Sequence, residues 1–303
     1  MKTRLYAGEE DLERILALQA AVRPPQQRSD YPGRVDFEEF LAQHGAAEWI
    51  QLWEDDRGDL QGYAWVDDYR NLHFEYRPQP GLGDAMVRWG LARAAELPVE
   101  EGDENLLDSS CRGSAAERIA LLRRHGFEDS PVRTVHYMHR LNTPPPTPQL
   151  PAGFMLRPLA GESEVGAVVA LHRAAFGTEQ MTEEYRLAIM HSSEYCPEMD
   201  WVVQAADGRL AAYCTGSLSP VGEEMVGYTD PVAVHPDFQR LGLAKAMLCA
   251  GAAALRARGA VCVRLGTTSD NTGMRRAAEA AGFELDYEVL WFSHPFDSPH
   301  LPS

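Results

Sequence analysis

The segment from Val232 to Ala254 constrains this chain more than any other part of its sequence. It opens with a short apolar run, Val-Ala-Val, of the kind that forms a strand. A turn around Gly242 follows, and apolar residues then recur at helical spacing from Leu243 onward. Because the first turn of a helix carries unpaired N–H donors and a partial positive charge, this strand–turn–helix unit predicts a site for a phosphate group.

The residues of this turn resemble a known motif. The run Gln-Arg-Leu-Gly-Leu-Ala at residues 239–244 is similar to the acyl-CoA pyrophosphate loop of the GCN5-related N-acetyltransferases (GNATs), written Gln/Arg-x-x-Gly-x-Gly/Ala. A strand that ends Val-x-Val-His-Pro precedes the loop, as is typical of that family. Asn271 lies before a predicted helix that ends in Ala281-Gly282-Phe283, which is also typical. Three matches in one order make the resemblance specific.

The resemblance implies a fold and a cosubstrate. GNAT domains have a mixed, mostly antiparallel sheet with helices on both faces, and the sheet splays between its fourth and fifth strands to hold the pantetheine of acetyl-CoA. The implied reaction moves an acetyl group from acetyl-CoA to the primary amine of a small molecule, without a metal. For Asn271, capping of the following helix is an equally good interpretation. The implied acetyl-CoA contacts are Val232, Ala233, Val234, Gln239, Arg240, Leu241, Gly242, Leu243, Ala244, Lys245 and Asn271.

Catalytic candidates lie on and beyond the strand before the loop. A general base helps because an amine with a pKa near 10.4 is mostly protonated at neutral pH. Asp230 and Glu224 are the acidic candidates, with a turn carboxylate and a solvated hairpin end as the respective alternatives. Many GNATs have a tyrosine acid where this chain has Ala278, so Tyr287 is a possible substitute, although a core aromatic is the simpler interpretation.

The sequence repeats its plan on either side of a proline-rich linker at residues 142–152. In the first half a strand over Leu72–Tyr76 leads to Gly-Leu-Gly-Asp-Ala-Met, which mirrors Gly-Leu-Ala-Lys-Ala-Met in the second half. We therefore predict an α/β (α+β) protein of two tandem GNAT-type domains, over residues 1–141 and 153–303. Tandem two-domain members of the family have the same plan.

The two copies are not equal. Pro78, Gln79 and Pro80 stand where the second copy has Gln-Arg-Leu, and the prolines remove two N–H donors. Asp84 replaces the lysine at the start of the helix, where a carboxylate repels a phosphate. We predict that the N-terminal copy is degenerate and binds acetyl-CoA weakly or not at all.

Composition limits the remaining possibilities. The chain has 303 residues and a formal net charge of −17, and both halves are acidic, which disfavours nucleic-acid binding. No apolar run is long enough for a membrane span, and no signal peptide is evident, so we expect a cytoplasmic monomer or homodimer. Five scattered cysteines and ten histidines show no disulfide or metal-ligand spacing. The alternative functions are a non-catalytic CoA-binding scaffold and transfer of an acyl group to oxygen or from a longer acyl-CoA.

Overall fold

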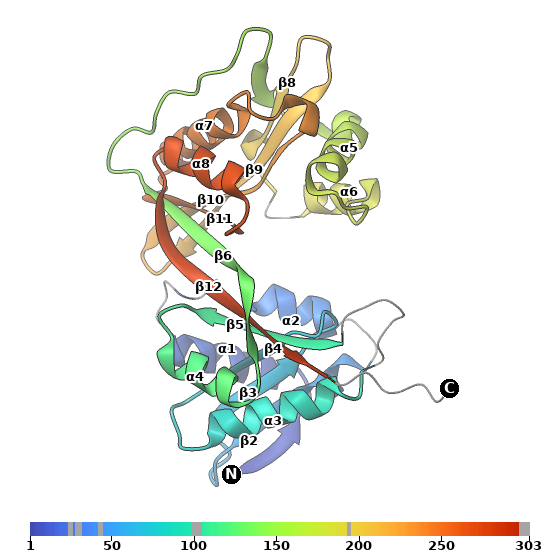
Figure 1. Cartoon of the computed structure of the whole chain (residues 1–303), viewed down its shortest axis with the longest axis vertical. Helices are drawn as coiled ribbons and strands as arrows, with labels where there is room; N and C mark the ends of the chain where they lie inside the picture. Colours follow the sequence, from blue (N-terminus) through green and yellow to red (C-terminus); the bar gives the residue numbers. More distant parts are fainter. Residues whose placement is uncertain (24–26, 28–31, 42–44, 98–104, 193–194, 297–303) are drawn as a thin grey trace. The chain divides into compact units, whose positions relative to one another are not determined.

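The computed structural model describes residues 1–23, 27, 32–41, 45–97, 105–192 and 195–296 (Figure 1). The chain forms two compact units. The N-terminal unit consists of Met1–Arg133 and Glu288–Ser303, and the C-terminal unit of Thr134–Tyr287.

The N-terminal unit contains an antiparallel sheet in the order β1-β2-β3-β4. A parallel bridge between Asn71 and Asp108 joins the beginning of β5 to the region before β4. Tyr63 and Trp65 of β3 are buried with residues of the first two helices, whereas Ala64 and Val66 pack with α3 and α4. The elements are β1 (Lys2–Leu5), α1 (Glu9–Val22), α2 (Arg34–Leu41), β2 (Ile50–Glu54), β3 (Leu60–Val66), β4 (Leu72–Tyr76), α3 (Leu82–Ala94), β5 (Leu106–Arg112) and α4 (Ala116–Arg124).

The C-terminal unit has the same succession of elements. Its strands lie in the order β11-β10-β9-β8-β7, and β10 and β11 are parallel while the other neighbours are antiparallel. The predicted mixed, mostly antiparallel sheet is therefore confirmed. The elements are β7 (Met155–Pro158), α5 (Val165–Phe176), α6 (Glu183–His191), β8 (Asp200–Gln204), β9 (Leu210–Val221), β10 (Glu224–Val234), α7 (Leu243–Ala257), β11 (Cys262–Thr268) and α8 (Thr272–Ala280).

Helices cover both faces of this second sheet (Figure 1). Helix α7 buries Leu243 and Met247 in a cluster with β8, β9 and β11. Helix α5 buries Val168 and Leu171 against Tyr213 of β9 and other residues on the opposite face. Each helix presents its apolar stripe to the sheet, as its 3.6-residue periodicity predicts.

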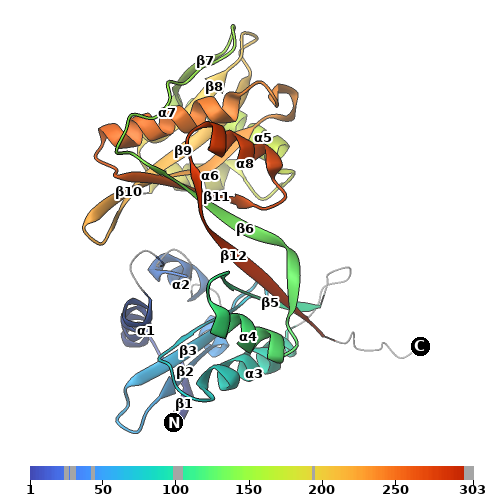
Figure 2. The same ribbon diagram turned by 60° about the vertical axis from the view of Figure 1, so that its left-hand side comes forward.

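The last strand of each copy extends into the other unit. Residues 134–140 of β6 (Glu128–Arg140) pair with β11, and residues 289–295 of β12 (Glu284–Pro295) pair with β5. Figure 2 shows both long strands. The compact units therefore differ from the predicted ranges 1–141 and 153–303, because the chain passes from one unit to the other within β6 and again within β12. The linker, residues 142–152, contains no helix or strand.

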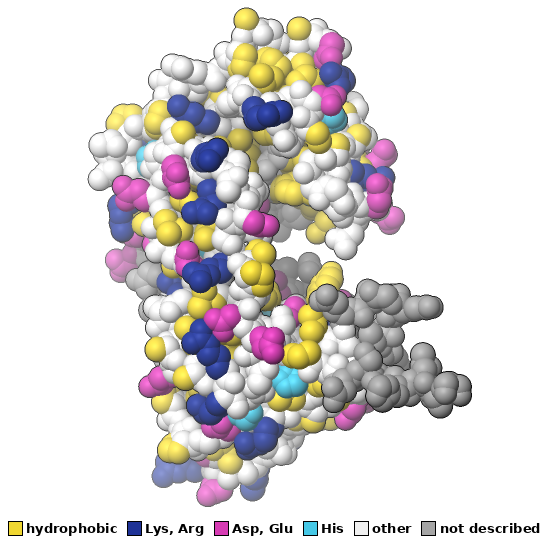
Figure 3. Space-filling model, in the orientation of Figure 1, with side chains coloured by type: hydrophobic (Ala, Val, Ile, Leu, Met, Phe, Trp, Pro, Cys, Tyr) yellow, Lys and Arg dark blue, Asp and Glu magenta, His cyan; other side chains and the backbone are white. Residues whose placement is uncertain are grey.

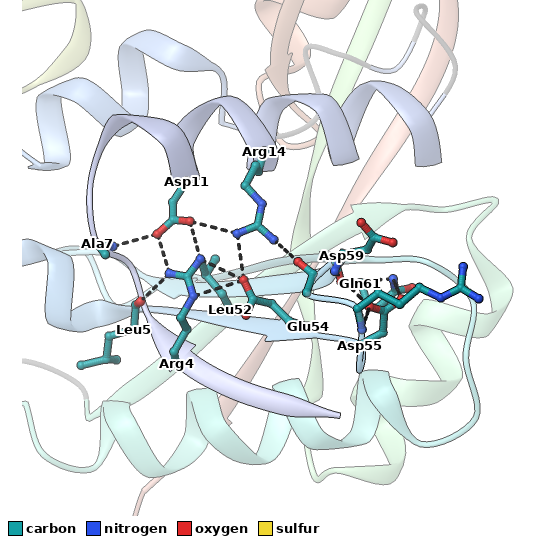
Figure 4. Close-up of polar contacts among 12 residues, drawn as sticks. Arg4, Leu5, Ala7, Asp11, Arg14, Leu52, Glu54, Asp55, Asp59 and Gln61 are labelled. Atoms are coloured by element: carbon teal, nitrogen blue, oxygen red, sulfur yellow. Dashed lines mark hydrogen bonds and ion pairs between the residues drawn. The ribbon is translucent and has the colours of Figure 1, made fainter.

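A network of charged side chains joins β1, α1 and β2 of the N-terminal unit (Figure 4). Asp11 is nearly buried and accepts two hydrogen bonds of 2.6 Å from Arg4 and one of 2.9 Å from the Ala7 N–H. Glu54 joins the network by accepting hydrogen bonds from Arg4 and Arg14. Desolvation opposes ionisation of Asp11, but the hydrogen bonds and the charges of both arginines outweigh it, so its pKa is lowered.

We expect Asp11→Asn to lower the free energy of unfolding by about 2 kcal/mol at pH 7, because it removes the carboxylate that accepts two hydrogen bonds from Arg4 and leaves only Glu54 to balance Arg4 and Arg14. A carboxyl whose pKa is lowered by folding stabilises above its unfolded pKa and loses that effect as the pH falls through the folded value. The difference from wild type should therefore shrink below about pH 4 in urea titrations. Asp129→Asn is the control, since the Asp129–Arg123 pair is half exposed and should change stability much less. Equal losses in the two variants would contradict this assignment.

Candidate active site

The sheet of the C-terminal unit opens between its fourth and fifth strands. The parallel pairing of β10 with β11 begins at Val226–Cys262 and ends at Tyr228–Arg264. Beyond that point β10 continues to Val234 along β9, while β11 continues to Thr268 along β6. Among the described residues, the edges of β10 and β11 that face each other are therefore unpaired beyond Tyr228 and Arg264. This is the splay that the resemblance predicts.

Asp230 lies where the two strands part. The register of β10 shifts between Thr229 and Val232, and such a bulge redirects the side chains beside it. The Asp230 side chain reaches solvent, yet nearby protein atoms remove part of its hydration, and this desolvation raises the pKa of its carboxyl. Burial raises the pKa of Cys214 on β9, and the charge of Asp230 raises it further, so Asp230 lies close to that strand.

The predicted phosphate loop follows β10 and ends at α7. Gly242 is the N-cap of α7 with φ of 80°, and Arg240 also has a positive φ, of 63°. Among the described residues, the backbone N–H groups of residues 240–245 have no hydrogen-bond acceptor. Successive free N–H groups at a helix start form an anion site. The side chains of Gln239, Arg240, Leu241 and Lys245 are exposed around it, whereas Leu243 is buried and anchors the helix.

A family comparison agrees with this geometry. The family described as "Acetyltransferase (GNAT) family" matches residues 166–283, which include β10, the loop and α8. Over these residues the chain is similar to the GNAT superfamily. The matched range lies within the C-terminal unit, where the strands part.

Several curated relatives of this chain are mycothiol acetyltransferases. That of Thermobispora bispora is 30% identical over 181 residues, covering 56% of this chain and 58% of that protein. That of Pseudarthrobacter chlorophenolicus is 28% identical over 250 residues, covering 77% of this chain and 74% of that protein. The chain thus spans little more than half the length of the first of these relatives.

Solved structures share the fold over nearly the whole chain. A GCN5-related N-acetyltransferase from Sphaerobacter thermophilus has a TM-score of 0.73 at 23% identity, covering 97% of this chain and 95% of that one. A tandem GNAT protein from the clavulanic acid biosynthesis pathway has a TM-score of 0.66 at 17% identity, covering 98% and 100%. The two-copy GNAT architecture is therefore a known one.

The other candidate residues lie elsewhere in the C-terminal unit. Glu224 is exposed at the beginning of β10, six residues and about 20 Å of strand from Asp230. Tyr287 lies on β12 and stacks on His136, with ring centroids 4.3 Å apart. Asn271 caps α8, since its side-chain oxygen accepts a hydrogen bond of 3.0 Å from the Met274 N–H. Of the three catalytic candidates, only Asp230 stands where β10 and β11 part.

His136 is a residue of this site region that sequence reasoning missed. It belongs to the first half of the sequence, but residues 134–140 pair with β11, and His136 lies directly opposite Gly266. It therefore stands in the C-terminal unit, next to the strand that borders the splay. Only the exchange of strands explains this position, and no local pattern around His136 could have indicated it.

A buried ion pair was also missed. Asp200 at the start of β8 is fully buried and pairs with Arg186 of α6. Tyr195 donates a hydrogen bond of 2.7 Å to the same carboxylate. Desolvation raises the pKa of Asp200 in spite of these partners. The pair ties α6 to the sheet. The sequence signal that could have indicated this ion pair is an aspartate at the first position of an apolar strand, Asp-Trp-Val-Val.

The N-terminal copy has a similar turn with different electrostatics. Gly81 is the N-cap of α3 with φ of 76°, like Gly242. Asp84 accepts hydrogen bonds of 2.8 Å from Arg124 and lies 2.8 Å from the His125 ring. These contacts hold the pKa of Asp84 well below its usual range. The predicted repulsion by Asp84 is therefore largely offset by neighbouring positive charge, and the loss of donors at Pro78 and Pro80 is the stronger argument.

Surface and composition add few constraints. Basic and acidic side chains are interspersed on the face drawn in Figure 3. Within the described part of the chain, no helix has the length and apolar character needed to span a membrane. No group of three His, Cys, Asp or Glu side chains among those same residues could hold a metal ion. All five cysteines are free.

Proposed function

We propose that the C-terminal unit transfers an acetyl group from acetyl-CoA to the primary amine of a small molecule. The observation that carries this proposal is the row of free N–H groups at residues 240–245, directly after a strand whose edge is unpaired beyond Tyr228. The N–H groups suit the pyrophosphate of acetyl-CoA. The backbone of Val232–Val234 suits the pantetheine amide and the thioester carbonyl, whose developing negative charge needs hydrogen-bond donors.

Asp230 is the proposed general base. Freeing a protonated amine with a pKa near 10.4 costs about 4–5 kcal/mol at pH 7. A carboxylate at the splay can accept that proton, directly or through a water molecule, as the amine nitrogen attacks the thioester carbon. The raised pKa of Asp230 supports this role, because a stronger base accepts the proton more readily. Collapse of the tetrahedral intermediate breaks the carbon–sulfur bond and releases the thiolate.

Departure of the thiolate depends less on an acid than attack by the amine depends on a base. Ala278, at the position of the usual tyrosine, is fully buried and has no acidic group. A thiolate with a pKa near 8.5 can leave without an acid. We propose Tyr287 as a donor when one is used, with its ring held in place by stacking on His136.

The proposed acceptor is a small molecule, and we propose that the N-terminal copy has no catalytic role. The relatives named mycothiol acetyltransferase support a small-molecule acceptor. Arg186, Asp200 and Tyr195 hold α6 against the sheet, which supports a structured wall near the acceptor side. The N-terminal copy lacks two of the loop donors.

Release of free thiol from acetyl-CoA tests this function. We expect saturable turnover with at least one member of a panel of small primary amines, including amino sugars and amino acids, and none without an amine. Mass spectrometry of the acceptor should show one added acetyl group on nitrogen. Tight binding of acetyl-CoA without turnover on any amine would favour the scaffold function, and acetylation on oxygen would favour the other alternative.

A further inference from the structure

The N-terminal unit contains a cavity of about 1070 Å³ between the end of β4, the end of β5 and the first turn of α4. This volume lies at the upper end of the range for small-molecule sites. Four arginines and two glutamates line it, although the chain as a whole has a net charge of −17. These residues are Arg23, Arg77, Arg112, Arg118, Glu75 and Glu117.

Two of the arginines are held by a buried carboxylate. Glu75 is nearly inaccessible and accepts a hydrogen bond of 2.9 Å from Arg118. Arg23 at the end of α1 forms an ion pair with the same carboxylate. The guanidinium of Arg118 also lies over the Phe74 ring, 3.8 Å from its centre, and donates a hydrogen bond to the Phe74 carbonyl. The position of Arg118 is therefore fixed by contacts on several sides.

These contacts occupy the strand backbone that would bind pantetheine in a working copy. Glu75 pairs with Tyr63, just as Ala233 pairs with Tyr213 in the C-terminal unit. Phe74 thus corresponds to Val232, one of the predicted acetyl-CoA contacts. Because Arg118 takes the Phe74 carbonyl, and Glu75 replaces a small apolar residue, this stretch of β4 is unsuited to pantetheine.

Donors remain available in the same cavity. Among the described residues, the Arg77 guanidinium forms no ion pair or hydrogen bond, and Arg118 Nε is buried without an acceptor. The first turn of α4 lines the cavity too. Its N-cap, Ala115, offers no side-chain acceptor, and the Glu117 and Arg118 N–H groups have none among the described residues. Guanidinium groups and a helix start are donors that carboxylates and phosphates prefer.

We propose that this cavity binds a small organic anion carrying carboxylate or phosphate groups, in place of acyl-CoA. Arg77 and the first turn of α4 bind the anionic group, and the Arg23–Glu75–Arg118 cluster forms a charged floor. The N-terminal copy has in this way become a binding site for a different ligand. The proposal is independent of the activity proposed for the C-terminal unit.

Calorimetric titration of the full chain with citrate and, separately, with inorganic phosphate tests the proposal. We expect one site for at least one of these anions, and the stronger of the two identifies the preferred group. Arg77→Gln should weaken binding about tenfold, because a charge-assisted hydrogen bond is lost from a partly exposed site. Arg57→Gln is the matched control, since Arg57 is an exposed arginine of the same unit outside the cavity, and it should leave affinity unchanged.

Three outcomes would overturn the proposal. The first is no binding of either anion at about 10 mM, a concentration that largely saturates a site with a Kd near 1 mM. The second is binding that neither Arg77→Gln nor Arg118→Gln weakens. The third is displacement of the anion by acetyl-CoA in the Gly242→Val variant, which would mean that the cavity is a second acyl-CoA site.

Discussion

Asp230→Asn is expected to lower kcat for acetyl transfer by about 100-fold or more, with the KM for acetyl-CoA changed less than about twofold. The asparagine keeps the shape of the side chain but cannot accept the amine proton. The loop that binds the pyrophosphate is not altered, so binding of acetyl-CoA should persist. Initial rates of thiol release at saturating amine, with acetyl-CoA varied, measure both constants.

The pH profile separates a base from a merely structural carboxylate. Desolvation raises the pKa of Asp230, so the wild-type rate should begin to fall on the acidic side at a pH above the normal aspartate range. Below that pKa the carboxyl is protonated and cannot act as a base. The Asp230→Asn variant should lose this acidic limb. An acidic limb that persists unchanged in the variant would show that another group titrates there.

We expect Asp230→Asn to lower activity without lowering the thermal stability of the protein. A carboxyl whose pKa is raised by folding contributes stability below its unfolded pKa and loses it as the pH rises through the folded value. At neutral pH the ionised Asp230 therefore costs stability, and Asp230→Asn should have an equal or higher Tm. Glu224→Gln, on the same strand and exposed, is the control and should retain activity. Loss of activity in Glu224→Gln alone would reassign the base.

The strand, loop and helix of the candidate site could be predicted because their signals are local. The strand that ends at Val234, the loop and the start of α7 follow one another in the chain, and their spacing alone indicates a helix that begins just after Gly242. The strand predicted over Leu72–Tyr76 is likewise observed with those bounds, since a short apolar alternation between turns leaves few choices. Local pattern was sufficient where neighbours in sequence are neighbours in space.

The exchange of strands could not be predicted for the opposite reason. Residues 134–140 pair with β11, more than a hundred positions later in the chain, and both copies offer a fifth strand of similar character. Nothing in the side chains of β6 selects between them. The position of His136 follows from that pairing and was hidden for the same reason.

Long-range ion pairs were hidden as well. Arg118 and Glu75 are separated by 43 residues and Arg186 and Asp200 by 14, and neither pair has a helical or strand spacing. The comparison of the two copies nevertheless used the right residues at the loop. It overestimated the repulsion by Asp84, because Arg124 of α4 forms an ion pair with that carboxylate and the His125 ring lies beside it. Charges at a site can be assessed only when all the elements around it are known.

Gly242→Val is expected to raise the dissociation constant for acetyl-CoA by about 100-fold or more. Gly242 has φ of 80°, a conformation that a β-branched residue strongly disfavours. Relief of that strain turns the backbone and misaligns the N–H groups of residues 240–245, each of which would lose a charge-assisted hydrogen bond to phosphate. Calorimetry on the full chain measures both the affinity and the number of sites.

Gly81→Val is a closely matched control for this experiment. Gly81 has φ of 76°, also caps a helix, and, like Gly242, has no protein atom within 4 Å of an added Cβ. The two valines therefore impose the same strain and meet the same open space, so a difference between them reports the function of the loop. We expect one acetyl-CoA per wild-type chain, lost in Gly242→Val and kept in Gly81→Val. Two sites in the wild type would mean that the N-terminal copy still binds acetyl-CoA, and unchanged affinity in Gly242→Val would mean that the loop at residues 239–245 is not the phosphate site.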